Sequence, residues 1–159
     1  MSNKNKKSNN KSPVTIENRK ARHNYHIDDS ITCGLVLTGT EIKSIRTGKA
    51  QLKDSFARIE KGEAWLYNCH ISPYQYGNRF NQDPIRKRKL LLHKKEILKL
   101  HAKIREKNYA LIPLKIFFSR NYAKLLLALA KGKKSYDKRE AIKKKELQRT
   151  IKEVKGKYI

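Results

Sequence analysis

The chain has 159 residues, enough for one domain with a modest core, and its 39 Lys and Arg against 14 Asp and Glu give a formal net charge of +25. Such an excess of positive charge indicates an anionic partner, most often a phosphate polymer such as RNA, with an anionic membrane as the alternative. The sequence has no apolar run long enough to span a membrane, no apolar core of a secretory signal and no cysteine framework, so we expect a cytoplasmic protein with reduced thiols.

The first predicted segments are an arm, a strand and a short helix. Residues 1–15 are rich in Asn, Ser and Lys, and we expect them to be a disordered basic arm. Residues 24–37 are rich in β-branched side chains and loosely alternating, which predicts a strand that breaks near residues 28–29. Thr40 is a candidate N-cap for a short helix over residues 41–46.

A hairpin is predicted near the middle of the chain. Residues 55–60 and 64–71 are rich in strand formers, and the segment between them contains Gly62, which suits a tight turn. Residues 72–84 contain Pro and Gly and are expected to form a loop.

A longer helix and a second hairpin complete the pattern. Apolar side chains recur at helical spacing over residues 97–104, with lysines on the other side. Residues 109–118 and 122–130 are predicted to pair as strands, and Pro113 should lie at a strand edge or at a bulge because it cannot donate a hydrogen bond to a neighbouring strand.

These elements predict a mainly β fold. Short antiparallel strands with two or three flanking helices are typical of a small antiparallel β-barrel of the oligonucleotide-binding (OB) type, here over residues 16–130. A basic two-layer α+β domain would give a similar pattern and stays an alternative. Either domain would itself be basic, since residues 21–130 carry 21 basic and 9 acidic side chains.

The C-terminal tail, residues 131–159, carries 12 Lys and Arg against 4 Asp and Glu. Leu147, Ile151 and Val154 would give a helix only a narrow apolar stripe, and an isolated helix of this kind is marginal in water. We therefore expect the tail to be disordered when free and helical on RNA. A basic amphipathic helix also suits a membrane surface, but the stripe lacks Trp and Phe, which favours RNA.

Three groups of side chains are candidate RNA contacts, although each could be an ordinary solvated surface. The consecutive cations Arg86, Lys87, Arg88 and Lys89 suit contact with phosphates. Where the arm meets the first strand, cations occur beside an aromatic ring, which suits phosphate contact and base stacking: Lys20, Arg22, His23 and Tyr25. Lys43 and Arg46 would project from one face of the short helix.

The sequence predicts neither an enzyme nor a metal site. The histidines and cysteines lack the spacing of a zinc site, and no cofactor motif is present. Glu41 and Lys43, after Asp28 and Asp29, weakly resemble the D…ExK arrangement of metal-dependent nucleases. A chance match is favoured, because Glu41 begins a helix whereas that chemistry normally uses a strand.

Four segments in order together resemble the SsrA-binding protein family, also called small protein B. They are residues 18–23, 34–46, 83–93 and 130–140, and their spacing is consistent with that family. The resemblance implies an OB-type barrel without catalysis. It also implies binding to the transfer-RNA-like part of transfer-messenger RNA and delivery of that RNA to stalled ribosomes, the body replacing a missing anticodon arm and the tail entering the empty message channel.

The resemblance also implies site residues. The RNA-facing body would comprise Lys20, Arg22, His23, Lys43, Arg46, Lys89, Leu91, His93 and Lys124, to which we add Tyr25, Arg86 and Arg88 from their chemistry. The part of the tail that works in the decoding region would comprise Lys131, Gly132, Lys133, Lys134, Tyr136, Asp137, Lys138 and Arg139. Thr32 stands where family members usually carry a Glu. Its hydroxyl can still hydrogen-bond a base or a ribose, so Thr32 belongs to the predicted RNA-facing residues, but the charge-assisted contact is lost.

The expected partners are therefore transfer-messenger RNA and the ribosome, with no membrane partner and a monomeric protein. A general structured-RNA-binding protein, or a ribosomal protein with a basic tail, is the alternative. The two differ in the work of the tail, which would be needed for rescue in the first case and for RNA affinity in the second.

Overall fold

The computed structural model describes residues 13–77 and 81–157, so most of the expected N-terminal arm lies outside the described residues. Its strands are β1 (Ile16–Glu17), β2 (Tyr25–Leu35), β3 (Ala50–Gln51), β4 (Phe56–Glu60), β5 (Glu63–Tyr67), β6 (His70–Ile71), β7 (Arg88–Leu91), β8 (Ala110–Ser119) and β9 (Tyr122–Gly132). Its helices are α1 (Ala21–Asn24), α2 (Gly39–Arg46), α3 (Lys94–Lys107) and α4 (Ser135–Lys157).

The main sheet is antiparallel and its pairings form a ring. The strand order is β1-β8-β4-β5-β7-β2-β9, and β9 also pairs with β8. Strands β8, β4, β5, β7, β2 and β9 therefore form a closed cycle of neighbours, with β1 added beside β8. Strands β3 and β6 form a separate two-stranded sheet.

Two boundaries in this cycle have the fewest paired residues, and we call them seams. At the β4–β8 seam the register contains one residue pair, Ala57 with Leu111. At the β2–β7 seam it contains two, Gly34 with Leu91 and Leu35 with Leu90. By contrast, the β2–β9 and β8–β9 pairings run along nearly the whole of those strands.

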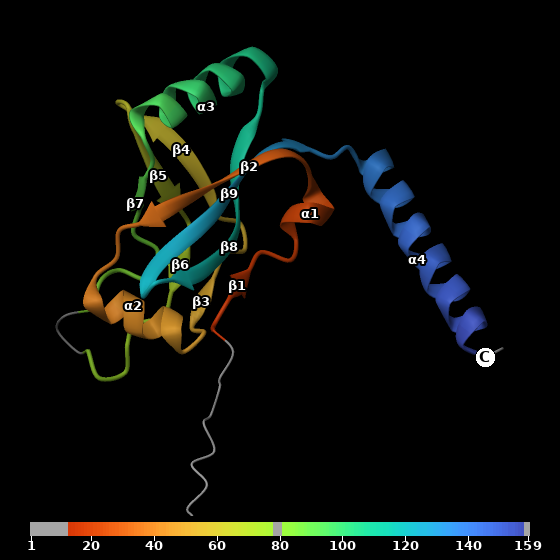
Figure 1. Cartoon of the computed structure of the whole chain (residues 1–159), viewed down its shortest axis with the longest axis horizontal. Coiled ribbons are helices and arrows are strands. Elements are labelled where there is room, and N and C mark those ends of the chain that lie inside the picture. Colours follow the sequence, from red (N-terminus) through yellow and green to blue (C-terminus); the bar gives the residue numbers. More distant parts are fainter. Residues whose placement is uncertain (1–12, 78–80, 158–159) are drawn as a thin grey trace, which may run out of the picture.

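Alternate residues of the strands fill the interior. Leu66, Leu90, Ile116, Leu125 and Leu127 are all at most 1 % exposed. Helices α2 and α3 lie at opposite ends of the sheet (Figure 1). A second, smaller apolar cluster lies under α1, where Ala21 packs with side chains of β8 and β9.

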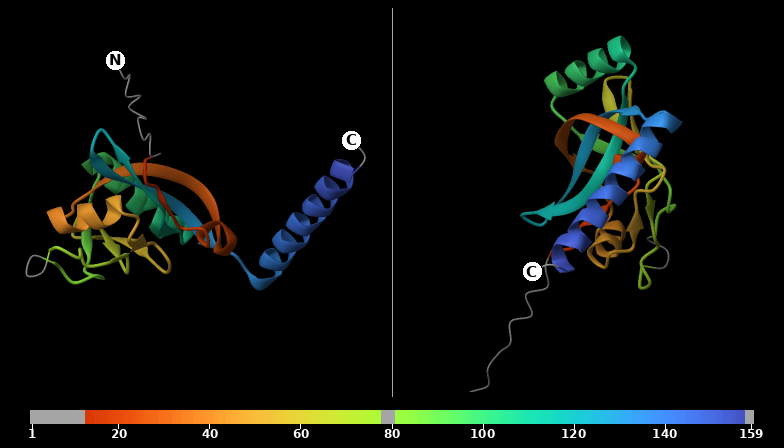
Figure 2. Two further views of the ribbon diagram at one scale, coloured as in Figure 1. Left: turned by 90° about the horizontal axis from the view of Figure 1, so that it is seen from below. Right: turned by 90° about the vertical axis from the view of Figure 1, so that its right-hand side faces the viewer.

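Helix α4 projects away from the rest of the molecule (Figures 1 and 2). Its root is held near α1, since the backbone N–H of Lys133 donates to the carbonyl of Asn24 at 2.8 Å. Side chains 142–156 are all exposed. No helix in the described ranges is both long enough and apolar enough to cross a membrane.

Most of the expected elements are confirmed. Both hairpins and the longer helix are present, and Pro113 lies at an irregularity in the β8–β9 register. The predicted break near residues 28–29 is wrong, because β2 is continuous and absorbs the irregularity as a register shift between Ile27 and Asp29. Strand β9 runs to Gly132, two residues beyond the expected end of the body.

The predicted cap of α2 is also wrong, because Thr38 and not Thr40 caps the helix. The Thr38 side chain accepts from the backbone N–H of Glu41 at 3.5 Å, and a Glu41 carboxylate oxygen accepts from the backbone N–H of Thr38 at 2.9 Å. This reciprocal pair is a capping box. Helix α1 was not predicted, since its four residues are too few to show a helical repeat.

Candidate nucleic-acid interface

A groove of about 840 Å³ runs along the β2–β7 seam beside the N-terminal end of α3. We call it the Leu91 groove. Its lining is Thr32, Cys33, Gly34, Lys61, Gly62, Glu63, Lys89, Leu90, Leu91, Leu92, His93, Lys94, Glu96, Ile97 and Lys124. The fold thus gathers into one groove the predicted residues Thr32, Lys89, Leu91, His93 and Lys124.

One set of directly paired residues from three neighbouring strands forms the floor of the Leu91 groove. Gly34 of β2 lies opposite Lys124 of β9 on one side and opposite Leu91 of β7 on the other. A Cβ atom at Gly34 would lie 3.1 Å from the Cβ of Leu91, so glycine leaves the space into which Leu91 leans. Leu91 remains 56 % exposed, which is unusual for a leucine in a sheet and suits packing against a ribose or a base.

The Leu91 groove is positively charged. Lys61, Lys89, Lys94 and Lys124 line it, against Glu63 and Glu96. Lys89 Nζ lies 2.8 Å from a Glu63 carboxylate oxygen, but both side chains are over 40 % exposed, so the pair is weak and can be exchanged for a phosphate. The Glu96 carboxylate accepts from the backbone N–H of His93 at the start of α3.

The other predicted body residues lie elsewhere. Lys43 and Arg46 are exposed on α2, where they lie over the rings of Tyr74 and Phe118 at 5.4 and 5.3 Å. On the far side of the closed sheet is the group at α1, namely Lys20, Arg22, His23 and Tyr25. The predicted residues therefore form three separate groups, of which only one lines the Leu91 groove.

Arg86 and Arg88 hold the fold together around Glu41. Arg88 is fully buried and donates to Glu41 at 2.9 Å and to the carbonyls of Cys69 and Pro84 at 2.6 and 3.1 Å. Arg86 donates to both Glu41 oxygens, at 2.9 and 2.6 Å. One carboxylate thus ties α2 to the segment that leads into β7.

The prediction that residues 86–89 contact phosphates is therefore wrong for Arg88, which is buried, and Arg86 already has a carboxylate partner. The physical reason is alternation along a strand, which points Lys87 and Lys89 outward and Arg88 inward. Arg88 can take this inward place because Glu41 and three backbone carbonyls accept hydrogen bonds from its guanidinium.

Glu41 has a structural role that leaves no oxygen free for catalysis. Burial raises the pKa of this carboxyl, but hydrogen bonds from Arg86, from the Thr38 amide and from Arg88 outweigh burial and hold the pKa below its ordinary value. The D…ExK interpretation fails on this geometry. Within residues 13–77 and 81–157, His, Cys, Asp and Glu side chains do not gather in groups of three that could hold a metal ion.

The predicted tail residues occupy two settings. Lys131 and Gly132 belong to β9, where Gly132 pairs with Tyr25. The following residues lead into α4 close to α1 and the start of β2: the Lys133 side chain donates to the carbonyl of Arg22 at 3.0 Å, and Asp137 of α4 lies 3.6 Å from His26 of β2. The remaining tail residues, Lys134, Tyr136, Lys138 and Arg139, lie on or just before the first turns of α4.

A row of aromatic side chains on the outer face of β4 and β5 was missed. Phe56 and Tyr67 stack with ring centroids 5.4 Å apart and planes 9° apart. Arg58 lies over Phe56 at 5.2 Å, and Lys87 lies over Trp65 at 4.6 Å. Alternation within the predicted hairpin could have placed these rings together on one face.

Known proteins resemble the chain over nearly its whole length. The SmpB protein family model matches residues 15–157. An SsrA-binding protein of Carboxydothermus hydrogenoformans is 59 % identical over 138 residues, which is 87 % of this chain and 93 % of the relative. An SsrA-binding protein of Staphylococcus saprophyticus is 57 % identical over 150 residues, covering 93 % and 97 %.

A solved structure supports the same assignment. It is described as "tmRNA-SmpB: a journey to the center of the bacterial ribosome" and superimposes with a TM-score of 0.67 at 50 % identity, covering 81 % of this chain and 94 % of its own. The chain therefore belongs to the SmpB protein family.

Proposed function

We propose that the chain binds transfer-messenger RNA and acts with it on the ribosome in trans-translation, as a cytoplasmic adaptor that catalyses no reaction. Relatives with more than half their residues identical are named for binding SsrA. A similar solved structure is named for transfer-messenger RNA, SmpB and the ribosome together. The net charge of +25 fits a protein that meets two RNA partners.

The Leu91 groove is the observation that carries this proposal. It combines an exposed apolar side chain, four lysines and the Thr32 hydroxyl in one concave surface. A structured RNA offers phosphates for the lysines and ribose and base edges for Leu91 and Thr32. We assign this groove to the transfer-RNA-like part, and the exposed Arg22, His23, Lys43 and Arg46 to further RNA contacts of the complex.

The proposal includes the finer architecture. We propose that the closed cycle of strands is a barrel of the OB type, supported by the ring of pairings and the leucines buried inside it. We also propose that the part of the tail that follows β9 is disordered when free and ordered in the message channel of the ribosome. The exposure of side chains 142–156 supports this, because the body contributes no packing to them.

A matched pair of leucines tests the proposed function. Leu91 and Leu98 are 56 % and 61 % exposed, but Leu98 lies on α3 outside the Leu91 groove. Leu91→Asp should weaken binding to a transcript of the transfer-RNA-like part by about tenfold or more, because it brings a carboxylate against phosphates. Leu98→Asp should stay within about twofold, as expected for a solvent-facing change.

The measurement is fluorescence anisotropy with the labelled transcript at fixed salt. Equal effects of the two variants would remove the Leu91 groove from the binding surface. Failure of the unmodified chain to prefer this transcript over an unrelated folded RNA would favour the general RNA-binding alternative.

A further inference from the structure

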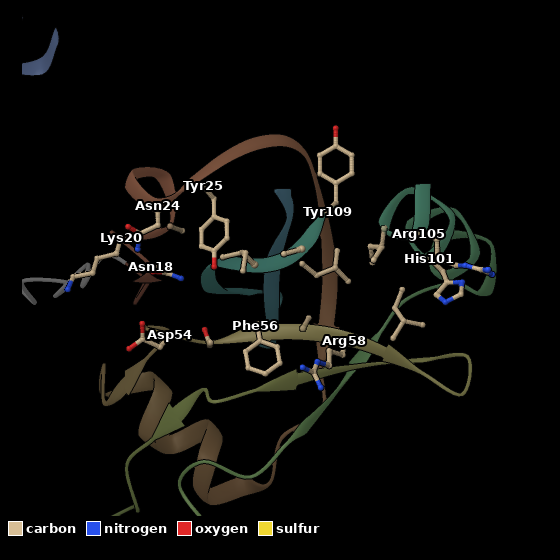
Figure 3. Close-up of a pocket in the computed structure, with 18 residues that line it drawn as sticks. Asn18, Lys20, Asn24, Tyr25, Asp54, Phe56, Arg58, His101, Arg105 and Tyr109 are labelled. Carbon is tan, nitrogen blue, oxygen red and sulfur yellow. The ribbon is translucent and has the colours of Figure 1, made fainter. Parts of the chain in front are cut away.

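A second groove lies on the other side of the closed sheet. It has a volume of about 670 Å³ and runs over the β4–β8 seam (Figure 3). We call it the Tyr25 groove. The lining residues used in the argument are Lys20, Tyr25, Asp54, Phe56, Arg58 and Arg105.

The two grooves are structurally independent. In the cycle β8-β4-β5-β7-β2-β9, the β4–β8 seam and the β2–β7 seam are separated by three strands in either direction. The grooves share no lining residue. Helix α3 reaches both, with Glu96 and Ile97 at the Leu91 groove and His101 and Arg105 at the Tyr25 groove. A ligand in one groove therefore leaves the other open.

Aromatic rings enter the Tyr25 groove from two strands. Tyr25 of β2 and Phe56 of β4 both line it, and Tyr25 points toward β4, whereas Tyr109 points away (Figure 3). One face of Phe56 is stacked on Tyr67, and the guanidinium of Arg58 lies 5.2 Å from the Phe56 ring. Arg58 is exposed, so a flat aromatic ligand can stack on its guanidinium plane or take its place on Phe56.

Cations without carboxylate partners surround these rings. Lys20, Arg58 and Arg105 are exposed, and none of them forms an ion pair within residues 13–77 and 81–157. Asp54 is the acidic residue in the lining, so the cations outnumber it. Stacking surfaces with adjacent unpaired cations are the chemistry by which proteins hold unpaired nucleotides of RNA.

We infer that the Tyr25 groove binds one unpaired nucleotide of a single-stranded RNA, with its base stacked beside Phe56 and Arg58. The strand's phosphates on either side of this nucleotide would extend toward Lys20 at one end of the groove and Arg105 at the other (Figure 3). The inference rests on the proposed function to the extent that the ligand is RNA. A base within a duplex is stacked on its neighbours and cannot enter, so the groove selects single strands. The nucleotide can come from transfer-messenger RNA or from ribosomal RNA.

The first test compares two double variants of the full chain. The probe is a fluorescein-labelled single-stranded RNA hexamer of mixed sequence, and the readout is anisotropy at fixed salt. Arg58→Ala with Arg105→Ala should weaken hexamer binding by about tenfold, as loss of a stacking and phosphate site predicts. Lys95→Ala with Lys107→Ala removes the same charge from exposed sites outside both grooves and should change binding by about twofold. Equal losses would overturn the inference.

A second pair of variants separates stacking from charge. Tyr25→Leu keeps an apolar side chain in contact with the cluster under α1 but removes the ring, whereas Tyr25→Phe keeps the ring. Hexamer affinity should fall several-fold in the first variant and stay within about twofold in the second. Thermal unfolding of both proteins checks the fold. An unchanged affinity in Tyr25→Leu would contradict stacking at this groove.

A final arm identifies the source of the nucleotide and separates this inference from the proposed function. The chain is first saturated with the transcript of the transfer-RNA-like part, and the hexamer is then added. Exclusion of the hexamer would assign the nucleotide to that RNA, and formation of a ternary complex would assign it to another RNA. Leu91→Asp should weaken binding of the transcript and leave binding of the hexamer unchanged. The proposed function and this inference can therefore fail independently, because each is tested with a different RNA.

Discussion

The body and the tail carry positive charge in opposite physical settings. In the body, strands of a closed sheet fix the lysines of the Leu91 groove around a packed interior. In α4, side chains 142–156 are all exposed, and among the described residues the hydrogen bonds and the ion pair that join the body to the start of the tail lie near the root of the helix. The body therefore sets the geometry of its own charges, whereas the tail must take its geometry from the surface that it meets.

Removal of the tail should give the largest effect and should separate the work of the tail from that of the body. Removing residues 133–159 leaves β9 complete through Gly132. We expect affinity for the transfer-RNA-like transcript to stay within about threefold, since the body retains both grooves, while peptide tagging on stalled ribosomes in a reconstituted system falls to background. Anisotropy and tagging assays measure the two effects on the same protein. A loss of transcript affinity above about tenfold would instead make the tail an electrostatic anchor, as in the general RNA-binding alternative.

The next largest effect is expected at the buried charges of the body. Glu41→Gln leaves the fully buried Arg88 without its carboxylate, and breaking a buried pair in this way costs about 3–5 kcal/mol of the free energy of unfolding. Urea unfolding measures it. Glu63→Gln, which breaks the half-exposed pair with Lys89, is the control and should cost less than about 1 kcal/mol. Equal costs would mean that the Glu41 network does not hold the fold.

The arginines at this network show where sequence reasoning stops. Hydrophobic alternation located both hairpins, and the apolar repeat located α3, because a buried face leaves a periodic trace. Four consecutive cations show no alternation between apolar and polar residues. The sequence therefore could not show that Arg88 points inward while Lys87 and Lys89 point outward. The Arg88 side chain can be buried because Glu41, which lies on α2 far away in the sequence, pairs with it.

In the candidate site, too, local patterns predicted single residues but not how residues from distant segments come together. Leu91 and Lys124 were predicted from motifs, but their convergence on Gly34 depends on pairings across three strands that no local pattern records. Tyr25 was predicted as a stacking residue, whereas Phe56, its neighbour across the second groove, was read only as a strand residue. Contacts between distant segments are therefore the part that required the structure.

Acid should weaken the body more than the tail. The folded-state pKa of Glu41 lies below its ordinary value of 4.5, because its hydrogen bonds outweigh burial. The carboxylate thus contributes stability above about pH 4.5, and this contribution is lost as the pH falls through the folded-state pKa. We would measure urea unfolding at several values between about pH 6 and about pH 3, which lie on both sides of the ordinary Glu pKa. The free energy of unfolding should decline with falling pH in the unmodified chain, and it should decline less in Glu41→Gln. The same decline in both proteins would assign it to other groups.

The smallest expected effect tests whether the tail supports the body at all. Cys33 and Cys69 are buried, and burial raises their thiol pKa to about 12 and about 11, so neither should react with a thiol reagent in the folded protein near neutral pH. Labelling then reports opening of the body. If the tail takes its geometry from its partners, removal of residues 133–159 should leave the labelling rate within about twofold of the full chain. Denaturant, as the positive control, should make both proteins react quickly. Faster labelling after truncation would show instead that the contacts at the root of α4, such as that of Lys133 with Asn24, brace the sheet.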